Sequence, residues 1–366
     1  LEQRAPYPHA REVLLTRSIE ESAGVLLVGH ARSVEATSLV NQGWCQAISP
    51  DLITRRRAWP QLEVTDGSER GETPVRLPRI VFQAIREAQG AVLVQVPRQG
   101  YRSSLACQSC RTRARCTSCE GPLMQTSAGS PPVCRWCATE HRDWMCGSCG
   151  GRQLRSPVVG QVRTAEEFAR AFPDRTVLAS GGSEVLETVE DQRALVLATP
   201  GAEPRIDGGY ACVILLDTWL MLARDDIRVV LESHRRWFEA LALGKFGARA
   251  IAVGDSAQLQ ALVRADPATV AERELQDRAE THLPPIGRLA VIDGYTDVID
   301  ALIDRDWTTS AEVLGPVPLP DGKSRLLLRA PRAEGMALAA ALKALAAERS
   351  AAKETPVRIQ IDPMSF

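Results

Sequence analysis

Short apolar runs alternate with segments of helical periodicity along most of the chain. The runs are almost continuously hydrophobic, which is typical of strands buried on both faces of a parallel sheet. They occupy residues 24–29, 91–96, 176–179, 194–198, 211–216 and 250–253. Segments with apolar residues three and four apart lie between and after them, at residues 33–42, 79–88, 165–172, 220–242 and 258–264. The pattern predicts an α/β fold with a doubly wound parallel sheet.

The pattern changes after about Pro267. A charged helix is predicted over residues 268–281, and then strand, helix, strand, strand, helix and strand at 289–292, 296–305, 312–314, 324–328, 335–350 and 357–361. This β-α-β-β-α-β order predicts a small ferredoxin-like α+β domain. Residues 55–73 are polar and poor in strand signals, so they are predicted to link two α/β units.

Length and composition narrow the class of protein. The chain has 366 residues and is 45% hydrophobic, enough for two or more domains with large cores. No apolar run approaches the roughly 18 residues of a membrane span, so we expect a soluble intracellular protein without a membrane partner. The net charge is -1, so no overall basic field points to a nucleic acid.

Eight of the ten cysteines form four Cys-x-x-Cys pairs in one block, Cys107/Cys110, Cys116/Cys119, Cys134/Cys137 and Cys146/Cys149. A two-residue gap lets both sulfurs of a tight turn reach one metal at about 2.3 Å. The block therefore predicts two four-cysteine zinc sites, which are structural because four thiolates leave no position for substrate. Cys45 and Cys212 lie in apolar stretches and are predicted to be core residues.

Other interpretations of the cysteines are weaker. Disulfide frameworks belong to small secreted chains, whereas this chain is long and shows no signal peptide. A thioredoxin-like site needs one Cys-x-x-Cys, not four in a row. His141 could replace a thiol, but a lone histidine between Glu140 and Arg142 is more often a solvated side chain.

Spacing leaves two ways to assign the cysteines to metals. The 14 residues between Cys119 and Cys134 contain glycines and prolines and have the length of a hairpin. A nested arrangement follows naturally, with Cys116, Cys119, Cys134 and Cys137 on the inner metal and Cys107, Cys110, Cys146 and Cys149 on the outer one. Sequential pairing would crowd two turns onto the spacer at residues 111–115, so it ranks second.

The cysteine block is rich in arginine. Eight arginines lie between residues 101 and 155, against three acids, and Trp136 and Trp144 lie among them. Such a module could contact phosphates and stack on bases, although charged residues could equally serve to solvate a small metal-bound fold. The candidate phosphate contacts are Arg102, Arg111, Arg113 and Arg115.

No catalytic constellation is recognisable in the sequence. A phosphate-binding loop of the form G-x-x-x-x-G-K-[ST] does not occur, nor does a G-x-S-x-G elbow or an H-E-x-x-H helix. Asp225 and Asp226 adjoin Arg224 and Arg228, a pattern typical of a salt-bridged surface. No catalytic residue is therefore assigned.

Several segments resemble the PriA family of replication restart proteins (primosomal protein N′), specifically its actinobacterial branch. Residues 4–17 (RAPYPHAREVLLTR) are similar to the segment after the Walker B box, and residues 24–37 (GVLLVGHARSVEAT) to helicase motif III. Residues 96–110 (VPRQGYRSSLACQSC) resemble the run into the family's first zinc knuckle. The family's C-terminal domain is matched by HLPPIGRLAVI, LGPVP and IDP at residues 282–292, 314–318 and 361–363.

This resemblance covers essentially the whole chain and implies its organisation. It implies two RecA-like helicase lobes, the first incomplete, a double zinc-binding insertion in the second lobe, and a C-terminal α+β domain. The expected bounds are 1–60 for the rest of lobe 1, 61–105 and 151–264 for lobe 2, 106–150 for the zinc module and 265–366 for the last domain. It also implies the nested pairing of the eight cysteines. Because the chain opens at Leu1, after the family's Walker motifs and N-terminal DNA-binding region, we expect a fragment.

Departures from the family's helicase motifs imply a lost motor. Motif III reads GSATP in helicase-active members, but residues 29–33 here read GHARS. Motif V reads GTQMLAKG, whereas residues 198–205 lack the glycine-bounded lysine. Motif VI carries two arginines that stabilise the transferring phosphate, but residues 241–250 offer only Lys245 and Arg249. ATP therefore remains a possible but disfavoured cofactor beside two structural Zn²⁺ ions.

The resulting hypothesis is a replication restart primosome protein of the bacterial cytoplasm, associated with the nucleoid. It would recognise stalled or abandoned replication forks, bind DNA and help reload the replicative helicase without helicase activity of its own. Its expected partners are forked or single-stranded DNA and other primosome and replication proteins. The alternatives are an ATP-dependent 3′-5′ DNA helicase and a zinc-ribbon adaptor that binds only proteins.

Overall fold

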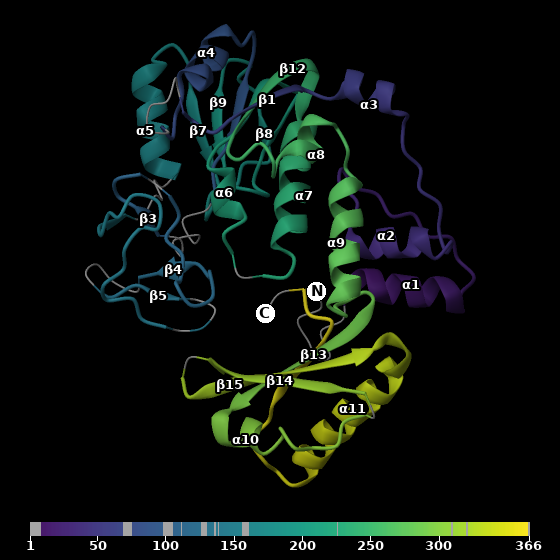
Figure 1. The fold of residues 1–366 in the computed structure, drawn as a ribbon. Helices are drawn as coiled ribbons and strands as arrows, with labels where there is room; N and C mark the ends of the chain where they lie inside the picture. The colour runs from purple at the N-terminus through teal and green to yellow at the C-terminus, as the bar shows by residue number, and fades with distance from the viewer. Residues whose placement is uncertain are drawn as a thin grey trace. The chain divides into compact units, whose positions relative to one another are not determined.

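The computed structural model describes residues 9–68, 75–97, 105–110, 112–125, 130–134, 137, 139–155, 161–224, 226–308, 310–319 and 321–364. Its contacts divide the chain into two compact units. One unit is formed by residues 48–270, and the other combines residues 1–47 with residues 271–366 (Figure 1).

A six-stranded parallel sheet forms the centre of the unit of residues 48–270 (Figure 1). Its strands are, from edge to edge, β1 (Gln61–Thr65), β12 (Gly244–Val253), β11 (Tyr210–Leu215), β2 (Val92–Gln95), β9 (Leu195–Ala198) and β7 (Val177–Ser180). Every pairing between them is parallel. All residues of β2 and β9 are buried, so both faces of the sheet are covered, as the continuous apolar runs predicted. A separate parallel pair joins β8 (Thr188–Val189) to β10 (Arg205–Ile206).

Two helices complete one core of this unit. They are α4 (Arg79–Glu87) and α5 (Gln161–Ala171), both predicted, and they bury Ile85 and Phe168 against alternate residues of the sheet such as Val94. Cys212 lies in the same core, which confirms its predicted burial. Removal from water raises the pKa of its thiol to about 12, so it is an inert core residue.

The helix predicted over residues 220–242 is wrong in its first half. The structure has a short α6 (Thr218–Met221), a turn, and then α7 (Val229–Ala242), which contacts β11 and β12 and buries Trp237 and Phe238. In the turn, the Asp226 carboxylate accepts a hydrogen bond of 2.7 Å from the Arg228 amide. Such a local bond offers the backbone an alternative to the helix. Only α8 (Gln260–Val263) remains of the helix predicted over residues 258–264.

The linker predicted at residues 55–73 is also wrong over its described part. The structure places α3 (Leu52–Ala58) and strand β1 there, and β1 pairs with β12 over five residues. β1 lies at the edge of the sheet and is exposed or half-buried along its length. An edge strand does not need the continuous apolar run that marked its neighbours, so the pattern missed it.

In the other unit, the N-terminal residues form α1 (Ala10–Glu20) and α2 (Val34–Asn41); the helix predicted over residues 33–42 is confirmed, and Ser33 caps it. The strand predicted at residues 24–29 is absent: this described segment pairs with no strand, and Leu26 and Val28 are 77% and 87% exposed. An apolar run becomes a strand only where a neighbour accepts its hydrogen bonds and covers it. Cys45 is half-buried rather than a full core residue.

The C-terminal residues of this unit form a four-stranded antiparallel sheet in the order β14, β15, β13, β16. The elements run β13 (Gly287–Tyr295), α10 (Thr296–Asp300), β14 (Glu312–Leu319), β15 (Lys323–Pro331), the short η2 (Arg332–Glu334), α11 (Gly335–Ala351) and β16 (Arg358–Ile361). This order confirms the predicted ferredoxin-like arrangement. Leu338, Leu342 and Leu345 of α11 pack on the sheet. Helix α9 (Thr269–Glu280) comes before the first strand of this sheet in the chain. Within the described residues, no helix is both long enough and apolar enough to cross a membrane.

Candidate metal centre and nucleic-acid interface

Eight cysteine sulfurs come together in two groups of four within residues 107–149. The outer group is Cys107, Cys110, Cys146 and Cys149, and the inner group is Cys116, Cys119, Cys134 and Cys137. The sulfurs of each group lie within 4.8 Å of one another. This is the nested arrangement, and the sequential alternative would join sulfurs that the structure keeps in different groups.

The distances between sulfurs fit tetrahedral zinc. In the outer group Cys107 lies 3.5 Å from Cys149, and Cys110 lies 3.5 Å from Cys146. In the inner group the Sγ of Cys119 is 3.4 Å from that of Cys134. Four sulfurs placed 2.3 Å from a central zinc would be about 3.8 Å apart, so a small expansion of each group accommodates the ion. Each group can therefore hold one Zn²⁺.

Short backbone bonds shape each Cys-x-x-Cys turn. The first cysteine of every turn donates its amide to the carbonyl five residues on, which belongs to Thr112, Gly121, Thr139 and Gly151, at 2.8 to 2.9 Å. Two small antiparallel pairs hold the turns in place: β3 (Ala106–Cys107) with β6 (Leu154–Arg155), and β4 (Leu123–Met124) with β5 (Val133–Cys134). The first pair closes the outer site, and the second is the hairpin of the inner site.

One threonine in each site favours the metal-binding form of a cysteine. Hydrogen bonds with the side chain and backbone of Thr112 lower the pKa of Cys110 to about 6. Thr139 does the same for Cys137, whose pKa is also lowered to about 6. The thiolate is the form that binds metal, so these bonds favour the binding form of Cys110 and Cys137, whereas desolvation and hydrogen bonds with the other thiols raise the pKa of Cys119 and of Cys149 to about 12.

His141 is not a metal ligand in this geometry. Its Nε2 lies 3.3 Å from the Sγ of Cys116, so it can donate a hydrogen bond to a ligand of the inner site. The sequence interpretation of a solvated histidine is therefore wrong, because the half-buried ring supports a ligand.

The two tryptophans predicted to stack on bases have different outcomes. Trp144 is 6% exposed and packs in the core of the zinc module with Leu105 and Leu123. It is therefore part of the metal-bound fold and cannot present its ring to a base. Trp136 lies outside the described residues.

Of the four candidate phosphate contacts, Arg102 and Arg111 lie outside the described residues. The guanidinium of Arg113 lies 5.2 Å from the ring centroid of Trp219 and donates to the Trp219 carbonyl at 3.4 Å. Burial lowers the pKa of Arg113. Arg115 is exposed and donates to the Glu120 carbonyl at 2.9 Å. Arg113 thus joins the zinc module to α6, while Arg115 remains at the surface.

The loop after β9, which the resemblance matched to motif V, is closed by the chain's own groups. The Glu203 carboxylate accepts hydrogen bonds from the Gln95 amide at 2.6 Å and from the Gly201 backbone at 2.8 Å. Burial raises the pKa of Glu203. Gly201 has a positive φ of 86°, and a Cβ there would clash with the Arg236 guanidinium. A carboxylate and a guanidinium therefore fill the space beside this loop.

Lys245 and Arg249 are the cations of the segment matched to motif VI. They lie toward the amino ends of the parallel strands, whereas the Glu203 loop lies at the carboxyl ends. Lys245 donates to the Gln89 carbonyl at 3.1 Å, and Arg249 pairs with Glu87 at 2.8 Å. Both partners precede β2, at the amino edge, whereas the Glu203 loop follows the carboxyl end of β9. Four residues of strand separate the amino ends from the carboxyl ends by about 13 Å. Neither cation can act at the Glu203 loop.

An ion pair that the sequence did not reveal lies at the carboxyl end of β11. Asp217 is 6% exposed and adopts a left-handed backbone conformation with φ of 51°. Its carboxylate accepts from Arg76 at 2.7 Å, and Arg76 also donates to Thr164 at 3.0 Å. Burial raises the pKa of Asp217, and Arg76 opposes that rise. No local signal marks this pair, because its members are far apart in the sequence.

Comparisons with known proteins find relatives over nearly the whole chain. Residues 279–364 match the family model described as the primosomal protein N C-terminal domain. The chain is 41% identical over 99% of its length to the "Probable replication restart protein PriA" of Mycobacterium leprae, and equally so to that of Mycobacterium tuberculosis strain H37Rv. It is 26% identical over 52% of its length to the "Replication restart protein PriA" of Treponema pallidum. The chain spans 60% to 61% of the length of the mycobacterial relatives. Over 99% of its length this chain is similar to replication restart proteins named PriA, and its residues 279–364 match the C-terminal domain of primosomal protein N.

Proposed function

We propose that this chain acts in the restart of DNA replication. It recognises stalled or abandoned forks, binds their DNA and helps reload the replicative helicase, without unwinding DNA itself. The observation that supports this most is the near-complete match to chains named replication restart protein, together with two four-sulfur centres in an arginine-rich block. The partners in this proposal are forked or single-stranded DNA and other primosome and replication proteins. The place of action is the nucleoid in the bacterial cytoplasm.

Each part of the chain has a distinct task in this proposal. Residues 106–150 form the zinc module, whose two Zn²⁺ ions fold the peptide and catalyse nothing because four thiolates close each site. Arg115, with Arg102 and Arg111, supplies phosphate contacts, and Arg113 anchors the module. Residues 61–105 and 151–264 form a RecA-like lobe, residues 1–60 belong to a preceding lobe, and residues 265–366 form the C-terminal domain.

The loops at the carboxyl ends of the parallel strands support the part of the proposal that assigns no motor activity to the chain. Loops at the carboxyl ends of the strands are the usual place for a nucleotide in parallel α/β sheets. Here the Gly201 amide already donates to the Glu203 carboxylate, and a second anion would be repelled by it. Toward the amino ends of the strands, Lys245 is bonded to the Gln89 carbonyl and Arg249 to Glu87. The guanidinium of Arg236, a cation beside this loop, is held by Glu232 at 2.9 Å and by Glu239 at 3.6 Å, which disfavours a role in stabilising a transferring phosphate.

DNA binding and ATP turnover test the proposal. Fluorescence anisotropy should show tighter binding of this chain to a forked DNA than to a duplex of equal length. A coupled assay of the full-length protein with the forked DNA should show ATP turnover below about one per minute, the range expected without an arginine that stabilises the transition state. Unwinding of the fork would establish the helicase alternative, and absence of DNA binding at low salt would establish the adaptor alternative.

A further inference from the structure

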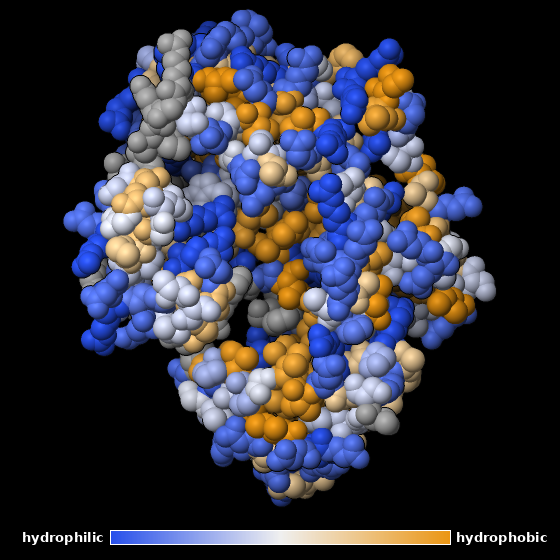
Figure 2. Space-filling model, viewed as in Figure 1, coloured by the Kyte–Doolittle hydropathy of each residue, from blue (hydrophilic) through white to orange (hydrophobic). Residues whose placement is uncertain are grey.

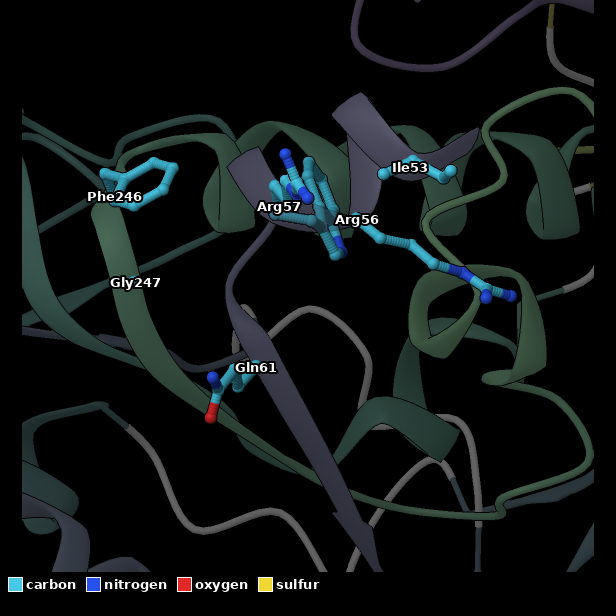
Figure 3. A pocket seen from close by; sticks show the side chains of 7 residues that line it. Ile53, Arg56, Arg57, Gln61, Phe246 and Gly247 are labelled. Carbon is cyan, nitrogen blue, oxygen red and sulfur yellow. The ribbon is translucent and has the colours of Figure 1, made fainter. Parts of the chain in front are cut away.

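A hollow of 470 Å³ opens at the edge of the six-stranded sheet, away from the zinc module in sequence. It lies between α3, the start of β1 and the start of β12 (Figure 3). Its volume is within the range of pockets that hold small molecules or single residues of a polymer. Neither the metal centres nor the Glu203 loop contributes to it.

Two aromatic rings line the hollow in different ways. The ring of Phe246 is 79% exposed at the start of β12, next to Gly247, whose φ is 73°. Trp59 is half-buried and fixed: its indole donates to the Leu262 carbonyl at 3.0 Å, and its ring lies 5.3 Å from that of Phe238. The fixed ring of Trp59 loses little side-chain freedom on binding, and the exposed ring of Phe246 offers an open face for stacking.

The charge of the hollow is positive and not neutralised. Arg56 and Arg57 of α3 are exposed and have no ion pair or hydrogen bond within the part of the chain that the structure describes. Their neighbour Arg55 contacts Asp266 at 3.9 Å. Among the residues that the structure describes, no acidic side chain lines the hollow. Figure 2 shows hydrophobic and hydrophilic side chains next to one another over α3.

We propose that this hollow binds one or two nucleotides of single-stranded DNA. The guanidinium groups of Arg56 and Arg57 contact successive phosphates, and a base stacks on Phe246 above the floor formed by Trp59. Unpaired cations beside exposed aromatic rings are the combination by which proteins hold single strands. An acidic peptide would satisfy the arginines but would leave both rings unused. This site deepens the proposed function by adding a DNA contact outside the zinc module.

Binding of a fluorescein-labelled 20-nucleotide oligo(dT) to the whole chain tests the arginines. The variant R56Q/R57Q should bind more weakly, and the slope of log affinity against log salt should flatten by about 1.4, which is two phosphate contacts on a single strand. The matched control is R86Q/R264Q, which removes the same charge from exposed arginines outside the hollow. Equal losses in both variants would mean a general charge effect and would overturn the site.

Substitution of Phe246 tests the stacking. F246A should weaken oligo(dT) binding about 5- to 150-fold, the effect of losing one base–aromatic stack. F246L should be nearly as weak, because it keeps apolar bulk but has no ring face. An exposed residue can be replaced without unfolding, which circular dichroism checks. Affinities of F246A and R56Q/R57Q within twofold of the unmodified chain would overturn the proposal.

Two further outcomes separate this inference from the proposed function. Phosphate contacts are strong at about 50 mM salt. If the unmodified chain does not bind forked DNA or oligo(dT) there, the proposed function and the DNA site in the hollow both fail. If it binds DNA and only the hollow variants are unaffected, the hollow alone fails. If poly-glutamate binding, and not oligo(dT) binding, is lost in R56Q/R57Q, the occupant is an acidic peptide. Cross-linking of iodouracil-substituted DNA to Phe246 or Trp59 would support the nucleic acid directly.

Discussion

At the scale of single residues, close approach of backbone and sulfur decides which substitutions the metal centres tolerate. A Cβ at Gly151 would lie 3.1 Å from the Cys107 sulfur and 3.3 Å from that of Cys149. A Cβ at Gly147, in the same turn, would meet nothing within 4 Å. A Cβ at position 151 would therefore force the two sulfurs of the outer site to shift by a few tenths of an ångström.

This difference gives a matched pair of variants. G151A should lower the zinc affinity of the outer site by about tenfold, because changes beside metal ligands typically have effects of that size. G147A should leave it unchanged. Competition with a chromophoric chelator measures both, and similar zinc release from the two variants would contradict the geometry.

The ion pair between Arg76 and Asp217 predicts a pH-dependent loss of stability. Burial raises the folded-state pKa of Asp217 and Arg76 opposes this, so R76M raises that pKa further. A carboxyl with a raised folded pKa loses stabilising free energy as pH rises from its unfolded value of about 3.9. R76M should therefore destabilise more at pH 8 than at pH 5, by about 3–5 kcal/mol at the higher pH.

Urea unfolding followed by tryptophan fluorescence measures this effect at both pH values. The double variant R76M/D217N is the control, since it removes the buried charge together with its partner. It should recover much of the lost stability at pH 8 and show little pH dependence. An equal loss in R76M at pH 5 and pH 8 would show that the unpaired carboxylate is not the cause.

At the scale of elements, Arg113 joins the zinc module to α6. A guanidinium over a tryptophan ring contributes about 1–2 kcal/mol when it is partly desolvated. R113A should therefore increase hydrogen exchange in α6 and in the adjoining turns of the module, without loss of zinc. R115A is the matched control, because Arg115 only contacts a carbonyl within the module. Unchanged hydrogen exchange in R113A would show that Arg113 does not anchor the zinc module to α6.

Elements also differ in how far their sequence predicted them. The buried strands β2, β9 and β11 and helices α4 and α11 were predicted, because complete burial or a regular apolar stripe is a local property. β1 was missed because an edge strand can be polar, and the apolar run at residues 24–29 was over-predicted because pairing needs a neighbour. A strand is a property of two segments, and only one of them is visible in a local window.

At the scale of the whole molecule, zinc binding is coupled to the folding of one module only. Zinc binding to such modules contributes about 10–16 kcal/mol of apparent free energy. A chelator should therefore make residues 106–150 sensitive to limited proteolysis while the six-stranded sheet keeps its far-ultraviolet circular dichroism. Added Zn²⁺ should restore resistance. Resistance that persists after complete metal removal, verified by elemental analysis, would show that the small core of Leu105, Leu123 and Trp144 folds without metal.

The sequence by itself determined the metal ligands, the parallel sheet and the C-terminal domain. Cysteine spacing, continuous apolar runs and element order act over a few residues, so they are legible without a fold. Only the tertiary structure decided the Arg113 anchor, the Glu203 closure, the Arg76–Asp217 pair and the hollow beside Phe246. Each of these joins side chains from separate segments, such as Arg113 with Trp219 and Trp59 with Phe238. Chain folding, and not local pattern, brings such groups within contact distance.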